Sequence, residues 1–270
     1  MLTLPPELQR EIFEWTATAY PSVAPKLLRV AQKTRLWLEP VIYRVVVLDS
    51  PMITISLFMR TLESKPPSFF AAHVKTLCLT ANTVTLQQAQ RLLSICSGLE
   101  NLICWAGANS ANLSSYISSK KLRRLSAKME VLFPEDPTMD DIRHPMFKAL
   151  THLDIVNPLE PPSLQHWDGL SALQNLTHLA LGDLFYWSPQ AVSTTITYIL
   201  DRCENLQALI VVCGSKPQRE RLALEHKDNT KLHLLPSFHH PQDYPVYMGE
   251  IRQRGDQGVW MNADREILVK

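Results

Sequence analysis

The sequence predicts an α/β protein in which three short N-terminal helices precede a short, irregular solenoid of parallel strands with helices on its convex side. A unit of the form L-x-x-L-x-L returns every 23 to 30 residues through the middle of the chain. Helical patterns occupy the segments between its copies, whereas the N-terminal part has neither the period nor the alternation of the unit. We therefore expect helices over 1–48, a linker over 49–73, repeats over 74–235 and a C-terminal capping segment over 236–270.

The composition is that of an ordinary soluble globular protein, since 46% of the 270 residues are apolar and 20% are charged. A formal net charge of +1 predicts no long-range attraction to nucleic acid or anionic lipid. The N-terminus lacks the basic and apolar stretches of a secretory signal, and no apolar run approaches the ~18 residues of a membrane span. We expect an intracellular protein, cytoplasmic or nuclear or both, that binds neither nucleic acid nor membranes.

The first helix is expected to begin at Pro5 and Pro6, because the missing N–H of a proline is tolerated in the first turn, and Thr3 is its expected cap. Tyr20 and Pro21 end it. The residues that share its apolar face are Leu8, Ile12, Trp15 and Ala19.

A second helix is expected over 24–31, and a third carries Leu36 and Trp37 before Pro40 breaks it. Three helices of this length bury a very small core. Such a unit would gain stability from a partner or from docking onto its neighbour.

The repeats are expected to form parallel strands. The second leucine of each unit falls at 77, 102, 125, 153, 179 and 209, with spacings of 25, 23, 28, 26 and 30 residues. These spacings lie almost wholly within the range of about 20 to 29 residues that is typical of leucine-rich repeats. Alternate apolar residues bury one face of a short strand, and stacking several strands side by side makes the core continuous.

Helices are expected to carry the chain back between strands. Residues 86–96 and 190–203 place their apolar side chains at helical spacing on one face. Gly182 follows the fifth unit, where a chain leaving a strand can use a positive φ. Asn82 continues the first unit as leucine-rich repeats usually do, but Gly107 and Leu184 occupy that position in the second and fifth, which predicts an irregular solenoid.

The alternation also predicts which side chains face solvent on the concave side of the sheet, namely those on either side of the second leucine. Tryptophan and arginine dominate binding hot spots, so this face is the expected site for a protein substrate. The candidate substrate-binding residues are Asn101, Trp105, Arg124, Lys128, His152, Asp154 and His178. Two alternatives are that Trp105 is covered by the C-terminal segment or the loop before it, and that His152 and His178, neighbours on adjacent strands, have a metal or pH role.

No catalytic motif is found. The sequence has no G-x-G-x-x-G, G-x-x-x-x-G-K-[ST], G-x-S-x-G or H-E-x-x-H, and only eight glycines. His239 and His240 near Asp243 are expected to be surface residues rather than metal ligands, and the acidic stretch 135–141 a solvated loop. The five cysteines lack a C-x-x-C pair and are expected to be small buried residues. We expect a protein that is not an enzyme and holds no cofactor or metal.

The N-terminal segments "LPPELQREIFEW" and "LLRVAQKTRLWLEPVIYRVVVL" resemble the F-box, in particular the short F-box of fungal proteins that continue into degenerate leucine-rich repeats. The matching positions are Leu4, Pro5, Glu7, Leu8, Ile12, Phe13, 28–30, Trp37 and 39–43. The resemblance covers residues 1–48 by motif and residues 74–213 by repeat pattern.

The resemblance implies that the helices bind a Skp-type adaptor and, through it, a cullin scaffold, while the repeats hold a protein substrate for ubiquitin-dependent degradation. The adaptor-binding residues that it implies are Leu4, Pro5, Leu8, Ile12, Leu28, Val30 and Trp37. Two alternatives are a leucine-rich scaffold whose helices only cap the solenoid, and a hydrolase or transferase with an unrecognised site. An exposed apolar patch over Leu4, Leu8 and Ile12 would distinguish the ligase subunit from the capped scaffold.

Overall fold

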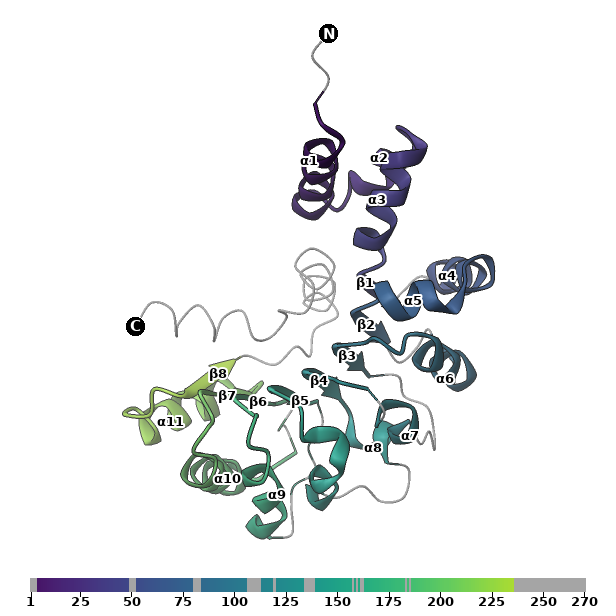
Figure 1. Ribbon diagram of the computed structural model, residues 1–270. Helices are drawn as coiled ribbons and strands as arrows, with labels where there is room; N and C mark the ends of the chain where they lie inside the picture. The colour runs from purple at the N-terminus through teal and green to yellow at the C-terminus, as the bar shows by residue number, and fades with distance from the viewer. Residues whose placement is uncertain are drawn as a thin grey trace.

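The computed structural model describes residues 4–48, 52–79, 84–105, 113–118, 120–133, 139–156, 158, 160, 163–182, 184 and 186–235. It is an α/β protein with one eight-stranded parallel sheet, compatible with a solenoid-like α/β fold. The strands line the inner side of the curve, longer helices lie on its outer side, and three helices stand beyond the first strand (Figure 1).

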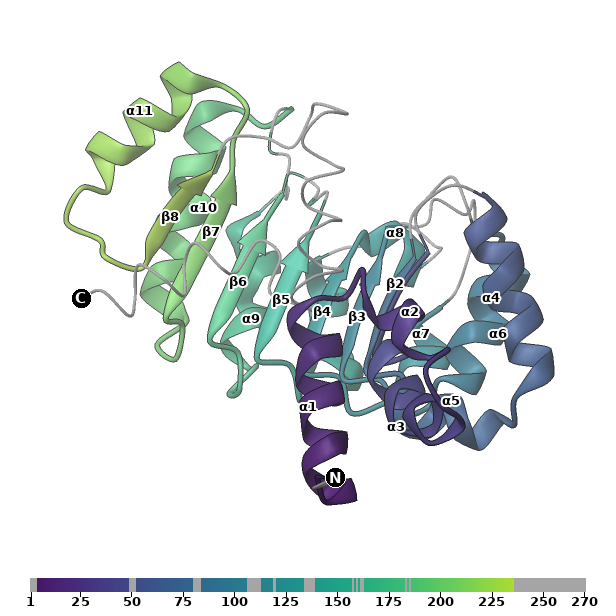
Figure 2. The same cartoon turned by 90° about the horizontal axis from the view of Figure 1, so that it is seen from above.

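Each strand pairs with the next strand along the chain, so the spatial order of the sheet is the sequence order (Figure 2). The strands are β1 (Val45–Leu48), β2 (Thr76–Leu79), β3 (Asn101–Cys104), β4 (Arg124–Ala127), β5 (His152–Ile155), β6 (His178–Leu181), β7 (Ala208–Val212) and β8 (Leu232–Leu235). The register aligns the second leucines of all six predicted units, which confirms them as adjacent parallel strands.

Helical segments return the chain between strands. After the first strand they are α4 (Met52–Ser64), α5 (Pro67–His73), α6 (Leu86–Ile95), α7 (Ser114–Ile117), α8 (Met129–Leu132), α9 (Asp168–Ser171), α10 (Pro189–Arg202) and α11 (Lys216–Glu225). Three 3-10 turns accompany them, η1 (Met139–Arg143), η2 (Pro145–Phe147) and η3 (Leu164–Trp167). The faces predicted for α6 and α10 are confirmed, because Ala89 and Leu93 of α6 and Val192, Ile196 and Ile199 of α10 are buried.

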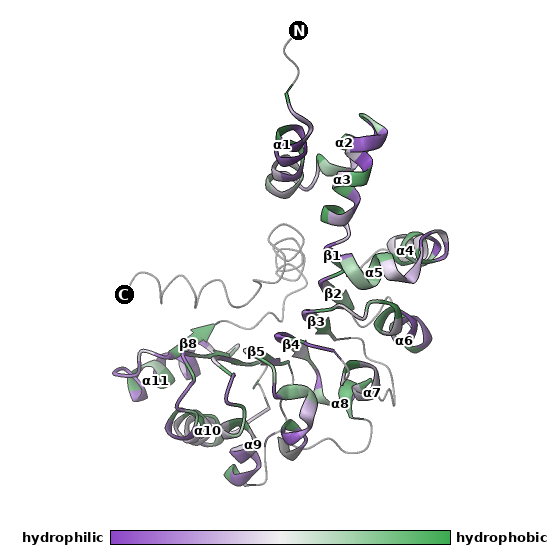
Figure 3. Ribbon diagram, viewed as in Figure 1, coloured by the Kyte–Doolittle hydropathy of each residue, from purple (hydrophilic) through white to green (hydrophobic). Residues whose placement is uncertain are grey.

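The core lies between the sheet and these helices. The central leucines Leu77, Leu102, Leu153 and Leu179 are at most 1% exposed and share one continuous cluster. Figure 3 shows α5 and α8 coloured mainly as hydrophobic, as expected of short segments that cover the sheet. No single strand could bury its apolar face alone, so stacking supplies the core.

A backbone pattern repeats where the strands begin. The carbonyl oxygen of Arg44, just before β1, accepts the N–H groups of Lys75 and Thr76, both at 3.0 Å. The carbonyl of Lys75 in turn accepts those of Glu100 (2.9 Å) and Asn101 (3.0 Å). The same pairing recurs at the carbonyls of Glu100, Arg123, Thr151 and Thr177. Each carbonyl has two lone pairs, so one acceptor satisfies two backbone donors at every step from β1 to β7.

The N-terminal helices are α1 (Pro6–Ala19), α2 (Ala24–Leu27) and α3 (Gln32–Ile42). Two expectations about them were wrong. The second helix ends at Leu27 rather than at 31, and Pro40 lies inside α3 instead of breaking it. Pro40 is only two residues from the end of α3, so its missing N–H removes a hydrogen bond from the last turn alone.

The sheet also begins earlier than the repeats were expected to. Residues 45–48, at the end of the predicted helical part, form β1, which pairs with β2. The expected linker, 49–73, carries α4 and α5 and so completes the first strand–helix step. Gly182 has no positive φ, and what requires a glycine there is the close approach of Val156, whose carbonyl oxygen would lie 2.6 Å from an added Cβ. The expected capping segment, 236–270, lies outside the described residues.

The start of α6 carries a reciprocal cap. The Thr85 hydroxyl accepts the N–H of Gln88 at 3.3 Å, and the Gln88 side-chain oxygen accepts the N–H of Thr85 at 2.9 Å. Thr85→Ala is expected to lower the free energy of unfolding by about 1 kcal/mol, because an N-terminal donor of the helix loses its partner. Denaturant unfolding followed by circular dichroism measures this. Ser94→Ala in the same helix is the control, since Ser94 is exposed and its hydroxyl only bonds back to Gln90; equal losses in both variants would contradict the prediction.

Candidate interaction surfaces

The three N-terminal helices enclose a small core of their own. Ala17 of α1, Ala24 of α2 and Leu38 of α3 are buried against one another. Phe13 packs on this cluster and lies 6.5 Å, centroid to centroid, from the ring of Trp37. These contacts show which face of α1 points inward, namely the one that carries Phe13 and Ala17.

The opposite face of α1 carries a stripe of exposed apolar side chains. Leu4, Leu8, Ile12 and Trp15 are 52%, 46%, 52% and 65% exposed. Positions 8, 12 and 15 fall on one face of the helix, and Leu4 precedes it by one turn. We call Leu4, Leu8, Ile12 and Trp15 the α1 stripe. Amphipathic helices normally turn their apolar face to the core, so a stripe left in solvent indicates a surface for a partner.

The structure places the seven implied adaptor-binding residues in two settings. Leu4, Pro5, Leu8, Ile12 and Val30 are exposed. Leu28 and Trp37 are half-buried instead: Leu28 packs on the core of the helical unit, and Trp37 lies against Phe13 and under the ammonium of Lys33, 5.6 Å from the ring centroid.

Three exposed apolar residues of the N-terminal helical unit, Trp15, Tyr20 and Leu36, were not among those seven. Trp15 continues the α1 stripe, and its ring meets that of Tyr20 edge-on at 6.4 Å. Leu36 of α3 is 66% exposed. The signal for Trp15 was present in the sequence, because it follows Ile12 by three residues on the predicted apolar face of α1.

The second candidate surface is the concave side of the sheet. Asn101, Arg124, His152 and His178 occupy the same register position on β3, β4, β5 and β6, and thus form one row across the sheet. Asp154 lies in the next row beside Ser126. Trp105 and Lys128 directly follow β3 and β4. All seven predicted substrate-binding residues therefore come from one side of four neighbouring strands.

A chain of hydrogen bonds crosses three strands on this side. The Trp105 indole N–H donates to the Ser126 hydroxyl at 2.8 Å, and that hydroxyl donates to Oδ2 of Asp154 at 2.6 Å. Burial raises the pKa of Asp154 to about 6, although the Ser126 bond opposes the shift. Ser126 was not among the candidate residues, yet it links two of them.

His152 and His178 are neighbours, as predicted. Their rings stack at 4.2 Å with an interplanar angle of 2°. The Thr151 and Thr177 hydroxyls lie 2.8 Å from Nδ1 of His152 and His178, respectively. Burial, with smaller contributions from the charges of Arg124 and His178, lowers the pKa of His152 to about 3, so its ring is neutral near pH 7.

The predicted exposure of this side was wrong for most of the flanking positions, since Cys78, Ser126, Ala180 and Ile210 are buried as well. Three of the seven candidate residues are among the buried ones. His152, Asp154 and His178 are only 8%, 7% and 6% exposed, and part of this burial follows from the stacking of the rings on adjacent strands. Asn101, Trp105, Arg124 and Lys128 are half-buried. The more accessible part of the row thus lies on β3 and β4.

Most of the remaining sequence candidates lie outside the part of the chain that the structure describes. His239, His240 and Asp243 lie outside the described residues, as does most of 135–141. Within the described ranges, no group of three or more His, Cys, Asp or Glu side chains is arranged to hold a metal ion. All five cysteines are buried, as predicted. No helix among the described residues is long and apolar enough to cross a membrane.

Comparison with models of known protein families finds none that matches the chain, and comparison with curated proteins finds no match either.

Proposed function

We propose that the chain is a substrate-binding subunit of a Skp/cullin/F-box-type ubiquitin ligase, acting inside the cell. In this proposal, helices α1–α3 are an F-box that binds a Skp-type adaptor, and the leucine-rich repeats hold a protein substrate. The chain itself performs no chemistry. It raises the effective concentration of substrate lysines near a charged ubiquitin carrier that other subunits supply.

The observation that carries the proposal is the exposure of the α1 stripe. Leu4, Leu8 and Ile12 are about half exposed, whereas the core of the helical unit is built from the opposite face of α1. Apolar side chains grouped on one helix face lose unfavourable contact with water when a partner covers them. A matching groove on an adaptor would bury this face as a helix in a groove.

The proposed substrate surface is supported by the half-buried end of the concave side. Arg124 begins β4, and Trp105 and Lys128 directly follow β3 and β4, so one aromatic ring and two cations line these two neighbouring strands. Side chains of these kinds suit a partner that offers apolar and acidic groups.

The alternative is a leucine-rich scaffold whose helices only cap the sheet. Tyr43, directly after α3, favours it, because it packs on Phe58, Phe69 and Phe70 beside β1. A helix that served only as a cap would turn its apolar side chains toward what it covers. The α1 stripe does the opposite, so we favour the ligase subunit.

The test is co-purification of the full chain with a Skp-type adaptor. Leu8→Asp with Ile12→Asp is expected to abolish capture, because two carboxylates would have to be desolvated in an apolar interface. The matched control is Arg10→Gln with Thr18→Asp, which changes the charge of α1 by the same two units at exposed positions outside the α1 stripe. Thermal unfolding of both variants checks that the fold survives.

Capture that the control keeps and the stripe variant loses would support the ligase subunit. A folded wild-type chain that captures no adaptor would contradict it and leave the capped scaffold. Loss of capture in both variants would show that charge on α1, and not the apolar face, determines binding.

A further inference from the structure

The link between the helical unit and the sheet is very short. Helix α3 ends at Ile42 and β1 begins at Val45, so only Tyr43 and Arg44 separate them. The N–H of Tyr43 donates to the carbonyl of Glu39 at 3.0 Å, and the carbonyl of Arg44 begins the backbone pattern of the sheet. A change in the angle between the two parts must therefore occur at Tyr43 and Arg44.

One side of this link is an aromatic cluster. The Tyr43 ring meets Phe69 edge-on at 5.4 Å and Phe70 at 6.2 Å. Phe70 is fully buried, and Phe58 of α4 lies 6.0 Å from it. Aromatic packing is strong but tolerates small rotations between offset and edge-on arrangements. The cluster holds Tyr43 at the sheet without fixing the direction in which α3 leaves it.

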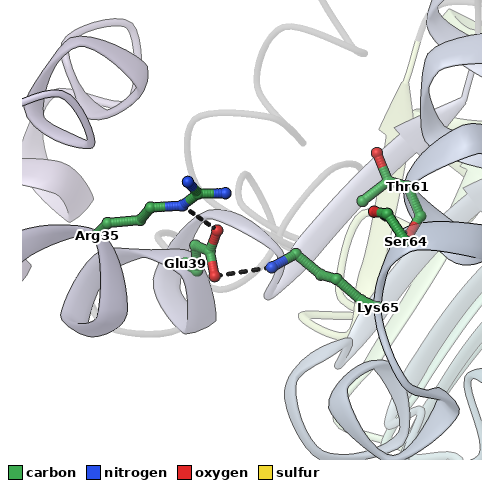
Figure 4. Close-up of polar contacts among 5 residues, drawn as sticks. All are labelled: Arg35, Glu39, Thr61, Ser64 and Lys65. Atoms are coloured by element: carbon green, nitrogen blue, oxygen red, sulfur yellow. Dashed lines mark hydrogen bonds and ion pairs between the residues drawn. The ribbon is translucent and has the colours of Figure 1, made fainter. Parts of the chain in front are cut away.

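Beside this cluster lies a charged contact between α3 and the loop that joins α4 to α5, and the Lys65 ammonium also lies over the Tyr43 ring, 5.9 Å from its centroid. Figure 4 shows the Glu39 carboxylate between Arg35 and Lys65. The Lys65 ammonium lies 2.8 Å from Oε2 of Glu39, and the Arg35 guanidinium lies 2.9 Å from Oε1. The side chains of Glu39 and Lys65 are 12% and 18% exposed, whereas that of Arg35 is 62% exposed.

Lys65 is held in place from its own side. Its N–H donates to the carbonyl of Thr61 at 3.2 Å, and Pro66 follows it directly as the residue before α5. Its ammonium also lies over the ring of Phe69, 4.6 Å from the centroid. A lysine whose backbone and side chain are both fixed loses little conformational entropy when it binds a carboxylate.

The two cations on Glu39 have different roles in the geometry. Arg35 and Glu39 are one turn apart on α3, so their ion pair stays within that helix. Lys65 belongs to the part of the chain that packs on the sheet, so its ion pair joins two parts. Burial raises the pKa of Glu39, but the hydrogen bonds and charges of Lys65 and Arg35 outweigh burial and lower it, which keeps the carboxylate ionised.

We infer that Lys65 is a latch that sets the orientation of helices α1–α3 relative to the sheet, with Tyr43 and its aromatic neighbours as the hinge. The ion pair with Glu39 fixes the angle at which α3 leaves β1. Without the latch, the helical unit swings about Tyr43 and Arg44 while both parts stay folded. Any effect of this orientation on where a substrate is held rests on the proposed function. The orientation itself does not depend on that function.

Spin labels on the full chain test the latch. Glu11→Cys on α1 and Asp201→Cys on α10 place labels on exposed sites of the two parts, and the five native cysteines are buried and react slowly. Distances between the labels are measured by double electron–electron resonance. The distribution is expected to be narrow in the parent protein and to broaden and shift in Lys65→Met, which keeps much of the side-chain stem but removes the charge.

Arg35→Gln is the matched control, because it removes the other cation from the same carboxylate without touching the contact between the parts. It is expected to leave the distribution narrow. Glu39→Gln is the second test variant. If Lys65→Met does not fold, the distance distribution of Glu39→Gln tests the latch in its place. A narrow, unshifted distribution in the folded test variant, or equal broadening in Arg35→Gln, would overturn the inference. Adaptor capture measured on the same variants separates the latch from the proposed function. Because Lys65 lies outside the α1 stripe, its loss is expected to leave capture intact.

Discussion

Replacing Gly98 by alanine is expected to lower the free energy of unfolding by about 3 kcal/mol, a large effect for one methyl group. Gly98 lies in the turn between α6 and β3, directly against the end of α5. A Cβ at this position would lie 2.0 Å from the carbonyl oxygen of Ala71 and 3.2 Å from its carbonyl carbon. Both atoms belong to the backbone and cannot rotate aside, so the turn or the helix must move. Denaturant unfolding followed by circular dichroism measures the loss.

Gly169→Ala is the control for this prediction. The nearest atom to its added Cβ is Cγ of Arg143, at 3.1 Å, which belongs to a flexible side chain. Gly169 lies in α9, where alanine is favoured over glycine by about 1 kcal/mol. We expect a stability within about 1 kcal/mol of the parent protein. Equal stabilities of the two variants would contradict a close approach of Gly98 to α5.

Asp154→Asn is expected to change how stability depends on pH. Burial raises the pKa of Asp154 from 3.8 to about 6, so between these values the folded protein holds a proton that the unfolded chain has released. Stability contributed by this proton is present below pH 3.8 and lost as the pH rises through about 6. The loss amounts to about 3 kcal/mol, at about 1.4 kcal/mol for each pKa unit. Asparagine does not ionise, and its oxygen can still accept the Ser126 hydroxyl.

The measurement is the difference in unfolding free energy between Asp154→Asn and the parent protein, from about pH 3 to pH 8. It is expected to move in favour of asparagine by about 3 kcal/mol as the pH rises. The difference is needed because His152 acts in the opposite direction. Its pKa is lowered from 6.5 to about 3, so the stability of its neutral form is lost as the pH falls below 6.5. A difference that stays constant with pH would contradict a buried, protonatable Asp154.

Six strands could be predicted because their leucines repeat at a steady spacing, and two could not. β1 has the alternating apolar residues Val46 and Leu48, but Tyr43 replaces the leading leucine and packs in the aromatic cluster. In β8 the leading position is Asn229, whose side chain accepts the N–H of Lys231 instead of joining the core. A terminal repeat has a neighbouring repeat on one side only. Its sequence departs from the pattern for that reason.

The candidate surfaces were only partly predictable. Helical spacing grouped Leu8, Ile12 and Trp15 on one face of α1, but the same spacing normally indicates a buried face. The buried face of α1 instead carries the small side chain of Ala17 and the ring of Phe13, because α1 must approach α3 closely. On the concave side, alternation identified the correct side of each strand. It could not show how deeply His152 and Asp154 would be buried, since burial also depends on the side chains of neighbouring strands.

The sequence-order pairing of the strands has a kinetic consequence. Because every strand bonds to the next one along the chain, each new pairing closes a loop of only one repeat. The entropy of loop closure is then nearly the same at each step, and contacts between distant parts of the chain are not needed to begin. Folding can therefore start at any well-packed pair of neighbouring repeats and spread outward in both directions. A lesion between two strands, such as alanine at Gly98 between β2 and β3, would divide this process into two separately folding segments.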